Sequence, residues 1–218
     1  MQKKHHIIKL IEQGEHQQLD FKFAINDSKK IARSLSAFAN TDGGRLLIGV
    51  KDNGSIAGVR SEEEYHMIEA ASQLYTRPEV KFETLKHNIN GKQVLEVIIE
   101  KSKNRPHFAP DEKGKMKAFV RVKDQNLLAN GLLLKVWEQQ KKETGVKIKY
   151  NDAEKLILKY LSENDYITFS KFKKLANITK NYAEKILVDF IVLDIIEIVI
   201  SDSLIFYRMK DSKFNILK

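Results

Sequence analysis

The chain has 218 residues and a formal net charge of +9, a length that fits one large domain or two small ones. Hydrophobic residues make up 42% of the sequence, which is enough for a packed core, and charged residues (31%) are spread along the chain, which excludes global disorder. The absence of cysteine excludes disulfides and cysteine-ligated zinc. No apolar stretch approaches the roughly 18 residues that a membrane span requires. We therefore expect a cytoplasmic protein with no membrane partner, and the basic balance favours a polyanion as partner.

The first elements alternate between helix and strand. A short amphipathic helix is predicted over residues 7–11, and apolar residues alternate with polar ones over residues 18–23, as in a half-buried strand. A second helix begins near Asp27 and ends at Gly43-Gly44, and a buried strand follows over residues 46–50. We expect the aromatic residues of the first strand, Phe21 and Phe23, to be in the core, together with Phe119 farther along.

The next segment continues this pattern. Ser61 and Glu64 match a capping box that opens a third helix, and Asn90-Gly91 predicts a hairpin between two strands. A further strand is predicted over residues 118–122. Helices that alternate with mostly antiparallel strands predict an α+β domain over residues 1–130.

The pattern changes after residue 130. A helix over residues 131–142 and a polar run over residues 143–151 predict a helical linker at 131–150. Three helices and a terminal hairpin around Asp202-Ser203 then follow within about 65 residues, which is the layout of a winged helix-turn-helix domain at 151–218. The predicted helices cover residues 153–161, 170–176 and 182–195, and the hairpin strands cover 197–200 and 204–208.

One stretch resembles a known family. Residues 36–50, which read SAFANTDGGRLLIGV, resemble the AFANT-x-GG-x-L-x-I-G-V signature of the Schlafen AlbA_2 family. Three further motifs agree in order: residues 15–22 resemble the family's acidic opening, residues 52–58 its D-x-G-x-I-x-G continuation, and residues 119–122 its closing strand. The resemblance covers about residues 10–130 and implies a mixed sheet with helices that binds nucleic acid. Gly43-Gly44 lacks the Gly-Lys-Ser/Thr of a phosphate-binding loop, so we predict an architectural role for these glycines.

The resemblance also implies a set of acidic residues. Glu15, Asp20 and Asp52 correspond to three carboxylates that form a metal-dependent ribonuclease site in some Schlafen members. Clustered carboxylates can hold Mg²⁺ or Mn²⁺, and Lys22, two residues after Asp20 on the same strand face, could neutralise phosphate charge. Position 20 is Asp where the family usually has Glu, and the side chain is one methylene shorter. The alternative is that all three are ordinary surface carboxylates.

A second set of candidate residues is basic. The densest basic stretch runs over residues 101–123, which suggests either a phosphate-binding surface or a solvated loop and strand face. The candidate nucleic-acid contacts in the first domain are Lys22, Arg45, Lys51, Lys101, Lys103, Arg105, Arg121 and Lys123.

The predicted recognition helix of the C-terminal domain is unusual. Lys180 and Lys185 near its start could contact phosphates or bases, with Thr179 as the N-cap. The rest of the helix is apolar nearly all round, which indicates a second buried face and, through it, a homodimer. DNA contact and dimerisation both stay open for this domain.

These observations predict a regulatory DNA- or RNA-binding protein, such as a transcriptional regulator, that forms a homo-oligomer. Two other classes remain as alternatives. One is an endoribonuclease that depends on Mg²⁺ or Mn²⁺ through Glu15, Asp20 and Asp52. The other is a protein-interaction module in which the apolar helix has the main role.

Overall fold

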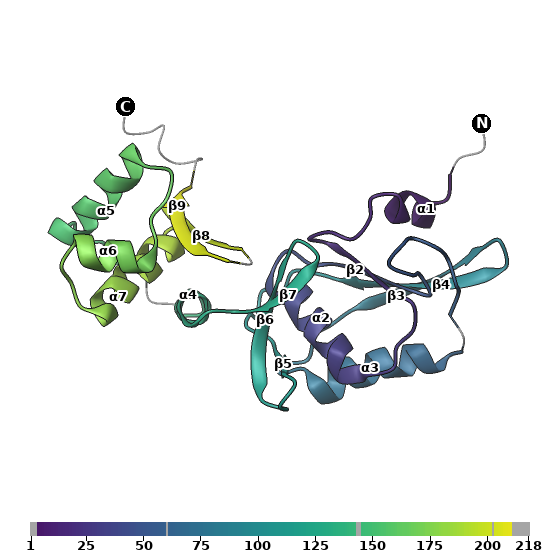
Figure 1. Ribbon diagram of the computed structural model, residues 1–218. Coiled ribbons are helices and arrows are strands. Elements are labelled where there is room, and N and C mark those ends of the chain that lie inside the picture. The colour runs from purple at the N-terminus through teal and green to yellow at the C-terminus, as the bar shows by residue number, and fades with distance from the viewer. Residues whose placement is uncertain (1–3, 60, 143–144, 202, 211–218) are drawn as a thin grey trace. The chain divides into compact units, whose positions relative to one another are not determined.

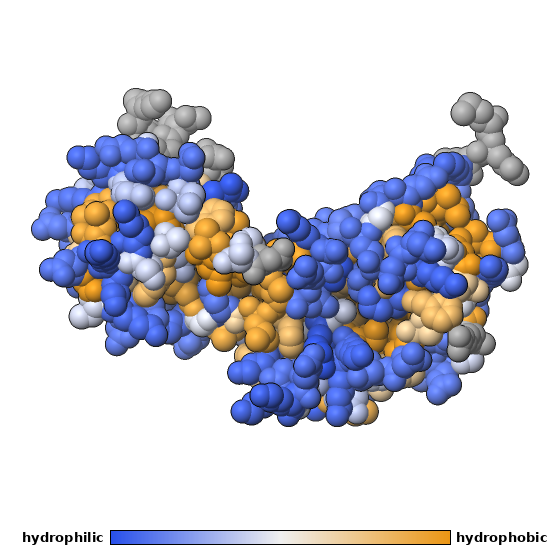
Figure 2. All heavy atoms as spheres, in the orientation of Figure 1, coloured by the Kyte–Doolittle hydropathy of each residue, from blue (hydrophilic) through white to orange (hydrophobic). Residues whose placement is uncertain are grey.

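The computed structural model describes residues 4–59, 61–142, 145–201 and 203–210, and the chain divides into two compact units, Met1–Ala129 and Asn130–Lys218 (Figure 1). Each unit has its own hydrophobic core. None of the described helices is both long and apolar enough to span a membrane. Hydrophilic residues cover most of the face shown in Figure 2, with smaller apolar patches between them.

A four-stranded sheet forms the centre of the first unit. Its order is β1-β2-β4-β3, with β1 (Leu19–Lys22) parallel to β2 (Gly44–Ile48). β4 (Lys92–Ile99) runs antiparallel to β2 and to the edge strand β3 (Glu83–Ile89). β3 and β4 form the hairpin predicted at Asn90-Gly91, and Asn90 has the positive φ that such a turn requires.

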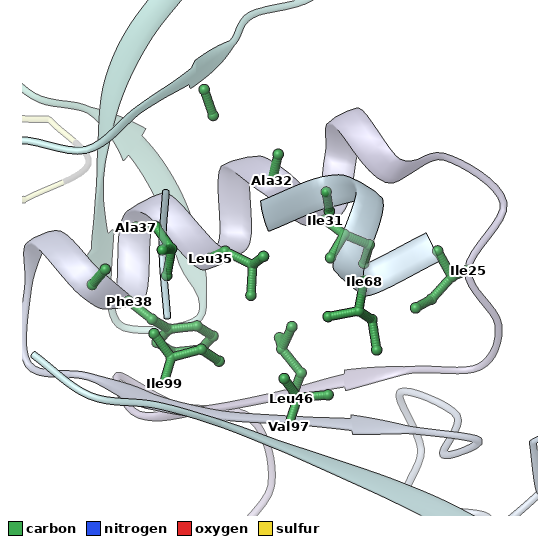
Figure 3. Close-up of a cluster of buried hydrophobic side chains, with 14 of the residues drawn as sticks. Ile25, Ile31, Ala32, Leu35, Ala37, Phe38, Leu46, Ile68, Val97 and Ile99 are labelled. Atoms are coloured by element: carbon green, nitrogen blue, oxygen red, sulfur yellow. The ribbon is translucent and has the colours of Figure 1, made fainter. Parts of the chain in front are cut away.

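Two helices cover one face of this sheet. Asp27 caps α2 (Ser28–Asn40) by accepting hydrogen bonds from two backbone N–H groups, and α3 (Glu63–Tyr75) packs beside it. Figure 3 shows Leu35 and Phe38 of α2 and Ile68 of α3 directed toward side chains of β2 and β4. The opposite face is covered by α1 (His6–Ile11), whose Ile7 is fully buried. Helices on a mixed sheet confirm the predicted α+β class.

A second sheet packs against α2. It contains β5 (Phe108–Pro110), β6 (Met116–Val122) and β7 (Gln125–Leu128), which are antiparallel in the order β5-β6-β7. α2 contacts both β5 and β6, and Phe119 belongs to the same core cluster as the helix. One helix therefore packs against both sheets of the unit.

Asn40, the last residue of α2, connects the helix to the second sheet. Its side-chain amide is buried and donates to the carbonyl oxygens of His107 (2.8 Å) and Phe119 (2.9 Å), while its carbonyl oxygen accepts the His107 N–H (2.8 Å). The next residue, Thr41, accepts the Arg121 N–H at 2.9 Å. Two adjacent polar residues thus fix the end of α2 against β6 and the chain that enters β5.

The double glycine that follows is architectural, as predicted. A Cβ at Gly43, where φ is +70°, would lie 2.7 Å from the Ile99 carbonyl oxygen, and a Cβ at Gly44 would lie 2.5 Å from the Phe38 ring. Only glycine fits between helix, ring and sheet at this point.

The described residues of the second unit form four helices and a hairpin. Part of the predicted linker (143–144) and the turn residue Asp202 lie outside the described residues. The helices and strands are α4 (Gly131–Gln140), α5 (Asp152–Glu163), α6 (Phe169–Leu175), α7 (Lys180–Val192), β8 (Ile196–Ile200) and β9 (Ile205–Met209). Three helices followed by a hairpin is the predicted order, and the winged-helix assignment stays a prediction.

The apolar character of α7 has an explanation within the unit. Its buried residues pack with Phe172 of α6 and Tyr207 of β9, and α4 contributes Leu132 and Val136 to the same core. The segment expected as a linking helix is thus part of this core, because its apolar stripe is buried against α7. The second apolar face of α7, which suggested a homodimer, is covered by α4.

Replacing the Asn40 side chain should destabilise the first unit. In Asn40→Ala, the Phe119 carbonyl oxygen and the His107 N–H lose their buried amide partner, so we expect the free energy of unfolding to fall by roughly 2–5 kcal/mol. Urea denaturation gives the loss, and hydrogen exchange assigns it to peptides of this unit. The exposed Asn104→Ala is the control. A loss in Asn40→Ala no larger than in the control would contradict the proposed role.

Candidate nucleic-acid interface

A cleft of about 740 Å³ opens on the first unit between α2, the edge strand β1 and the face of β6 and β7. Its lining contains seven Lys or Arg side chains and four Asp or Glu side chains, which leaves a surplus of positive charge. The lining residues are Asp20, Lys22, Lys30, Arg33, Ser34, Asp111, Glu112, Lys113, Lys115, Lys117, Phe119, Arg121, Asp124, Asn126 and Leu128.

The strand wall of the cleft follows from β alternation. Lys117, Phe119 and Arg121 occupy alternate positions of β6, so they share the face that lines the cleft. In the antiparallel register Phe119 pairs with Leu128 and Arg121 pairs with Asn126. This wall therefore changes along its length from cationic to apolar to polar.

The helix wall is held to the second sheet by hydrogen bonds. Arg33 Nε donates to the Pro110 carbonyl oxygen at 2.9 Å, and the Ser34 hydroxyl accepts from the Asn126 side-chain amide at 3.0 Å. Lys30, one turn earlier on α2, is exposed. The contacts of Arg33 and Ser34 hold α2 at the distance that leaves the cleft open.

Asp111 organises the turn between β5 and β6. Its carboxylate accepts the backbone N–H groups of Lys113 (2.9 Å) and Lys115 (2.8 Å). The hydrogen bond from Lys115 is the main cause that holds the pKa of Asp111 below its ordinary value. The turn is thereby fixed, and its exposed lysine side chains lie at one end of the cleft.

The other end of the cleft holds a buried ion pair. Arg121 donates to Asp20 (3.2 Å) and to Asn126 (3.1 Å), and its guanidinium lies 5.1 Å from the centre of the Phe38 ring. Its side chain is only 2% exposed. Lys22 Nζ lies 2.7 Å from the second Asp20 oxygen, which forms no hydrogen bond of good geometry. Arg121, predicted as a phosphate contact, is therefore a buried partner of Asp20.

Two of the three predicted carboxylates lie together. Glu15 accepts the Phe21 N–H at 2.8 Å. Burial, together with a hydrogen bond to Asp20, raises the pKa of Glu15 above its ordinary value. Asp52 is exposed in the turn after β2. Across residues 4–59, 61–142, 145–201 and 203–210, no three His, Asp or Glu side chains are grouped so that they could hold a metal ion.

The arrangement around Asp20 does not fit a Mg²⁺ or Mn²⁺ site. Both Asp20 oxygens already face cations, Arg121 and Lys22. A divalent ion would have to displace these charges, and Glu15 already accepts the Phe21 N–H. The residues around Asp20 therefore do not support a metal-dependent reaction.

Arg45 lies on the opposite face of the sheet. It pairs in register with Leu19, one residue from Asp20, so its side chain is on the α1 side. There Arg45 Nε donates to the buried carboxylate of Glu96 at 2.8 Å, which also contacts His87 (2.8 Å) and His6 (3.3 Å). Burial opposes ionisation of Glu96, but the hydrogen bonds from the two histidines outweigh it, and the pKa of Glu96 is lowered.

The remaining predicted contacts are dispersed. Lys51 lies 5.5 Å from the ring centre of Phe23, which is 42% exposed, so the prediction of Phe23 as a core residue is wrong. Phe23 follows the last residue of β1, beyond the covered part of the sheet. Lys101 pairs with Asp42 at 3.3 Å. Lys103, Arg105 and Lys123 do not line the cleft either.

In the second unit, both predicted lysines form ion pairs on α7. Lys180 lies 3.8 Å from Glu184, and Lys185 lies 2.5 Å from Asp189. Lys135 of α4 also pairs with Glu184. α4 and α7 flank a separate cavity of about 580 Å³.

Several cleft residues were missed from the sequence. Lys113, Lys115 and Lys117 were seen only as part of a dense basic stretch, although their spacing of two residues was a usable signal. Lys30 and Arg33 gave no signal, because the polar face of a helix does not reveal what it faces.

Replacing the buried Arg121 should destabilise the fold of the first unit and not merely remove a contact at its surface. In Arg121→Ala the Asp20 carboxylate loses a buried partner, so we expect a loss of about 3–5 kcal/mol in the free energy of unfolding. The exposed neighbour variant Lys123→Ala should change it by less than about 0.5 kcal/mol. Urea denaturation measures both. Equal stability of the two variants would show that Arg121 is not a structural residue.

The raised pKa of Glu15 gives a pH-dependent prediction. A carboxyl whose folded pKa lies above its ordinary value of 4.5 loses stabilising effect as pH rises through the folded pKa. Glu15→Gln keeps an acceptor for the Phe21 N–H and carries no charge. The variant should therefore melt at a higher temperature than the wild type at about pH 7.5, with the difference vanishing near about pH 4.

Melting curves with and without Mn²⁺ complete this test. In one outcome, Mn²⁺ raises the melting temperature of the wild type but leaves that of Glu15→Gln unchanged. That result would show that the carboxylates bind a cation after all.

Two solved structures are similar to part of this chain. The crystal structure of the DIP2311 protein from Corynebacterium diphtheriae is similar at 20% identity and a TM-score of 0.43, covering 66% of this chain and 33% of that chain. The solution structure of the N-terminal domain of a protein related to the ATP-dependent DNA helicase RecG, from Nitrosomonas europaea, is similar at 15% identity and a TM-score of 0.38, covering 68% of this chain and 99% of that domain.

The chain thus spans about a third of the length of the DIP2311 protein. No curated protein matches it. The family model described as Schlafen, AlbA_2 matches residues 15–130, more than half of the sequence and nearly all of the first unit. On this match the chain belongs to the Schlafen AlbA_2 family, and its first unit is a nucleic-acid-related domain.

Proposed function

We propose that the first unit binds nucleic acid by contacting phosphates with the lysines of the cleft. One observation supports this most directly. Lys30, Lys113, Lys115 and Lys117 are exposed around the cleft, and none forms an ion pair within 4.0 Å in the described part of the chain. Asp111 attracts Lys115 and Lys117 at longer range, but no ion pair has to break before these four side chains contact a polyanion.

The acidic residues of the cleft do not cancel this charge. Asp20 is engaged by Arg121 and Lys22, and Asp111 accepts the backbone N–H groups of its own turn. Glu112 and Asp124 are exposed, so four acidic side chains face seven basic ones and the cleft keeps a surplus of positive charge. This supports a net attraction for phosphate.

The regulatory role and the contribution of the second unit are part of the same proposal. A winged-helix unit attached to a nucleic-acid-binding domain is suited to a transcriptional regulator on DNA or a regulator of RNA. Its α7 is flanked by α4, and Lys180 and Lys185 already pair with acids on the same helix. The first unit is therefore the better supported contact. Self-association would require a surface other than the covered face of α7.

Substituting the lysines at and next to the β5–β6 turn should weaken the binding of nucleic acid and reduce its dependence on salt. In the triple variant Lys113→Ala, Lys115→Ala, Lys117→Ala, three phosphate contacts are lost, so the log–log salt slope should fall by about 2.7 on duplex DNA and about 2.1 on a single strand. Fluorescence anisotropy titrations at several salt concentrations measure the slope.

A matched variant controls for net charge. Lys81→Ala, Lys86→Ala and Lys92→Ala remove the same charge from exposed positions outside the cleft. This control should bind as the wild type does. Equal losses in the two triple variants would show that only net charge matters, and the cleft would then have no specific role.

A further inference from the structure

The chemistry of the cleft changes along its length in one direction. Lys113, Lys115 and Lys117 lie at one end, next to the β5–β6 turn. Farther along β6, Phe119 and Leu128 form a cross-strand apolar pair. Arg121 and Asn126 form the next pair on the same face, beside the polar edge of β1. A cationic end, an apolar middle and a polar end follow one another within one cleft.

We propose that this cleft binds an unpaired nucleotide of a single strand. Its phosphates would lie at the lysine end, its base against the exposed Leu128 beside the buried Phe119, and its base edge toward Lys22 and Asn126. This inference rests on the proposed nucleic-acid-binding function and adds to it the kind of strand that is bound.

The apolar pair of Phe119 and Leu128 favours a single strand over a duplex as the ligand. A duplex presents phosphates and groove edges to a protein, and its base faces are stacked on one another, so it offers Leu128 only sugar C–H groups and thymine methyl groups. An unpaired base exposes an apolar face together with a hydrogen-bonding edge, the combination that proteins recognise in single strands. Leu128 is 55% exposed, although most of the other residues that line the cleft are charged.

The size and the remaining donors agree with a nucleotide. About 740 Å³ lies within the range of pockets that hold small ligands, and it is much smaller than the volume of even a short double helix. At the polar end, Lys22 Nζ contacts Asp20 at 2.7 Å and the Phe21 carbonyl oxygen at 2.8 Å. An ammonium has three N–H donors, so one remains for a base edge, and the side chain is 34% exposed.

The test compares one labelled oligonucleotide of about 12 nucleotides as a single strand and as a duplex with its complement. Fluorescence anisotropy with the full chain should show tighter binding of the single strand, by about tenfold. Leu128→Asn keeps the size and charge of the side chain but removes its apolar contact. It should weaken single-strand binding by about tenfold and leave duplex binding unchanged.

Two further variants keep the result interpretable. Leu128→Phe restores an apolar face and should bind the single strand at least as tightly as the wild type does. Leu74→Asn makes the same change at a residue of α3 that is 62% exposed and outside the cleft, and it should have no effect. Similar weakening by Leu74→Asn, or by Leu128→Phe, would overturn the assignment of the base to Leu128.

The outcomes distinguish this inference from the function on which it rests. Equal affinity for strand and duplex, with Leu128→Asn silent on both, overturns the inference and leaves phosphate binding by the lysines in place. Displacement of the strand by equal concentrations of a free nucleoside monophosphate also overturns it, because the cleft would then be a small-molecule site. No binding of either nucleic acid at low salt overturns the proposed function itself.

Discussion

The buried amide of Asn40 is the constraint on which the first unit depends. It gives three hydrogen bonds to the backbone of His107 and Phe119, and so ties the end of α2 to the second sheet. Because buried backbone groups need partners, this junction is specified far more strictly than an apolar contact would be. Its consequence reaches the other end of α2, since the angle fixed at Asn40 sets where Lys30 and Arg33 stand relative to β6. The cleft lies beside the first half of α2, where the hydrogen bonds of Arg33 and Ser34 to the second sheet complete the position that Asn40 sets.

Much of the fold was predictable, because its determinants are local. The alternation over residues 18–22, the Asn90-Gly91 turn and the double glycine each indicate a backbone geometry that a few neighbouring residues decide, and the structure contains all three. The role of Asn40 was not predictable, even though it stands inside the most recognisable motif. A polar residue at the end of a helix is usually solvated, and nothing in the local pattern shows that a strand some 80 residues later would cover it.

The candidate site was predictable only in part, for the same physical reason. Lys22 was identified and lines the cleft, whereas Arg121 lines it as a buried partner of Asp20 rather than as a solvent-facing cation. Alternation along a strand shows which residues share a face, but it does not show whether that face meets solvent, a helix or an ion pair. Arg45 illustrates the limit: it is basic and lies next to the family motif, yet it faces α1 and is bound to Glu96. Similarly, the apolar surface of α7 revealed that a second partner was needed, but not that α4 of the same chain supplies it.

The carboxylates at the polar end of the cleft have a physical role even without a metal ion. Asp20 lies between the cations of Arg121 and Lys22, so the charged groups at this end are already paired with one another. A phosphate placed there would compete with Asp20 for these cations, whereas at the other end it would meet the exposed side chains of Lys113, Lys115 and Lys117, for which the described part of the chain shows no ion pair within 4.0 Å. In the proposed complex, this difference between the two ends would orient the nucleotide. Replacing Asp20 would leave Arg121 and Lys22 without their carboxylate and so remove the difference, whereas replacing Arg121 would keep the difference and destabilise the unit.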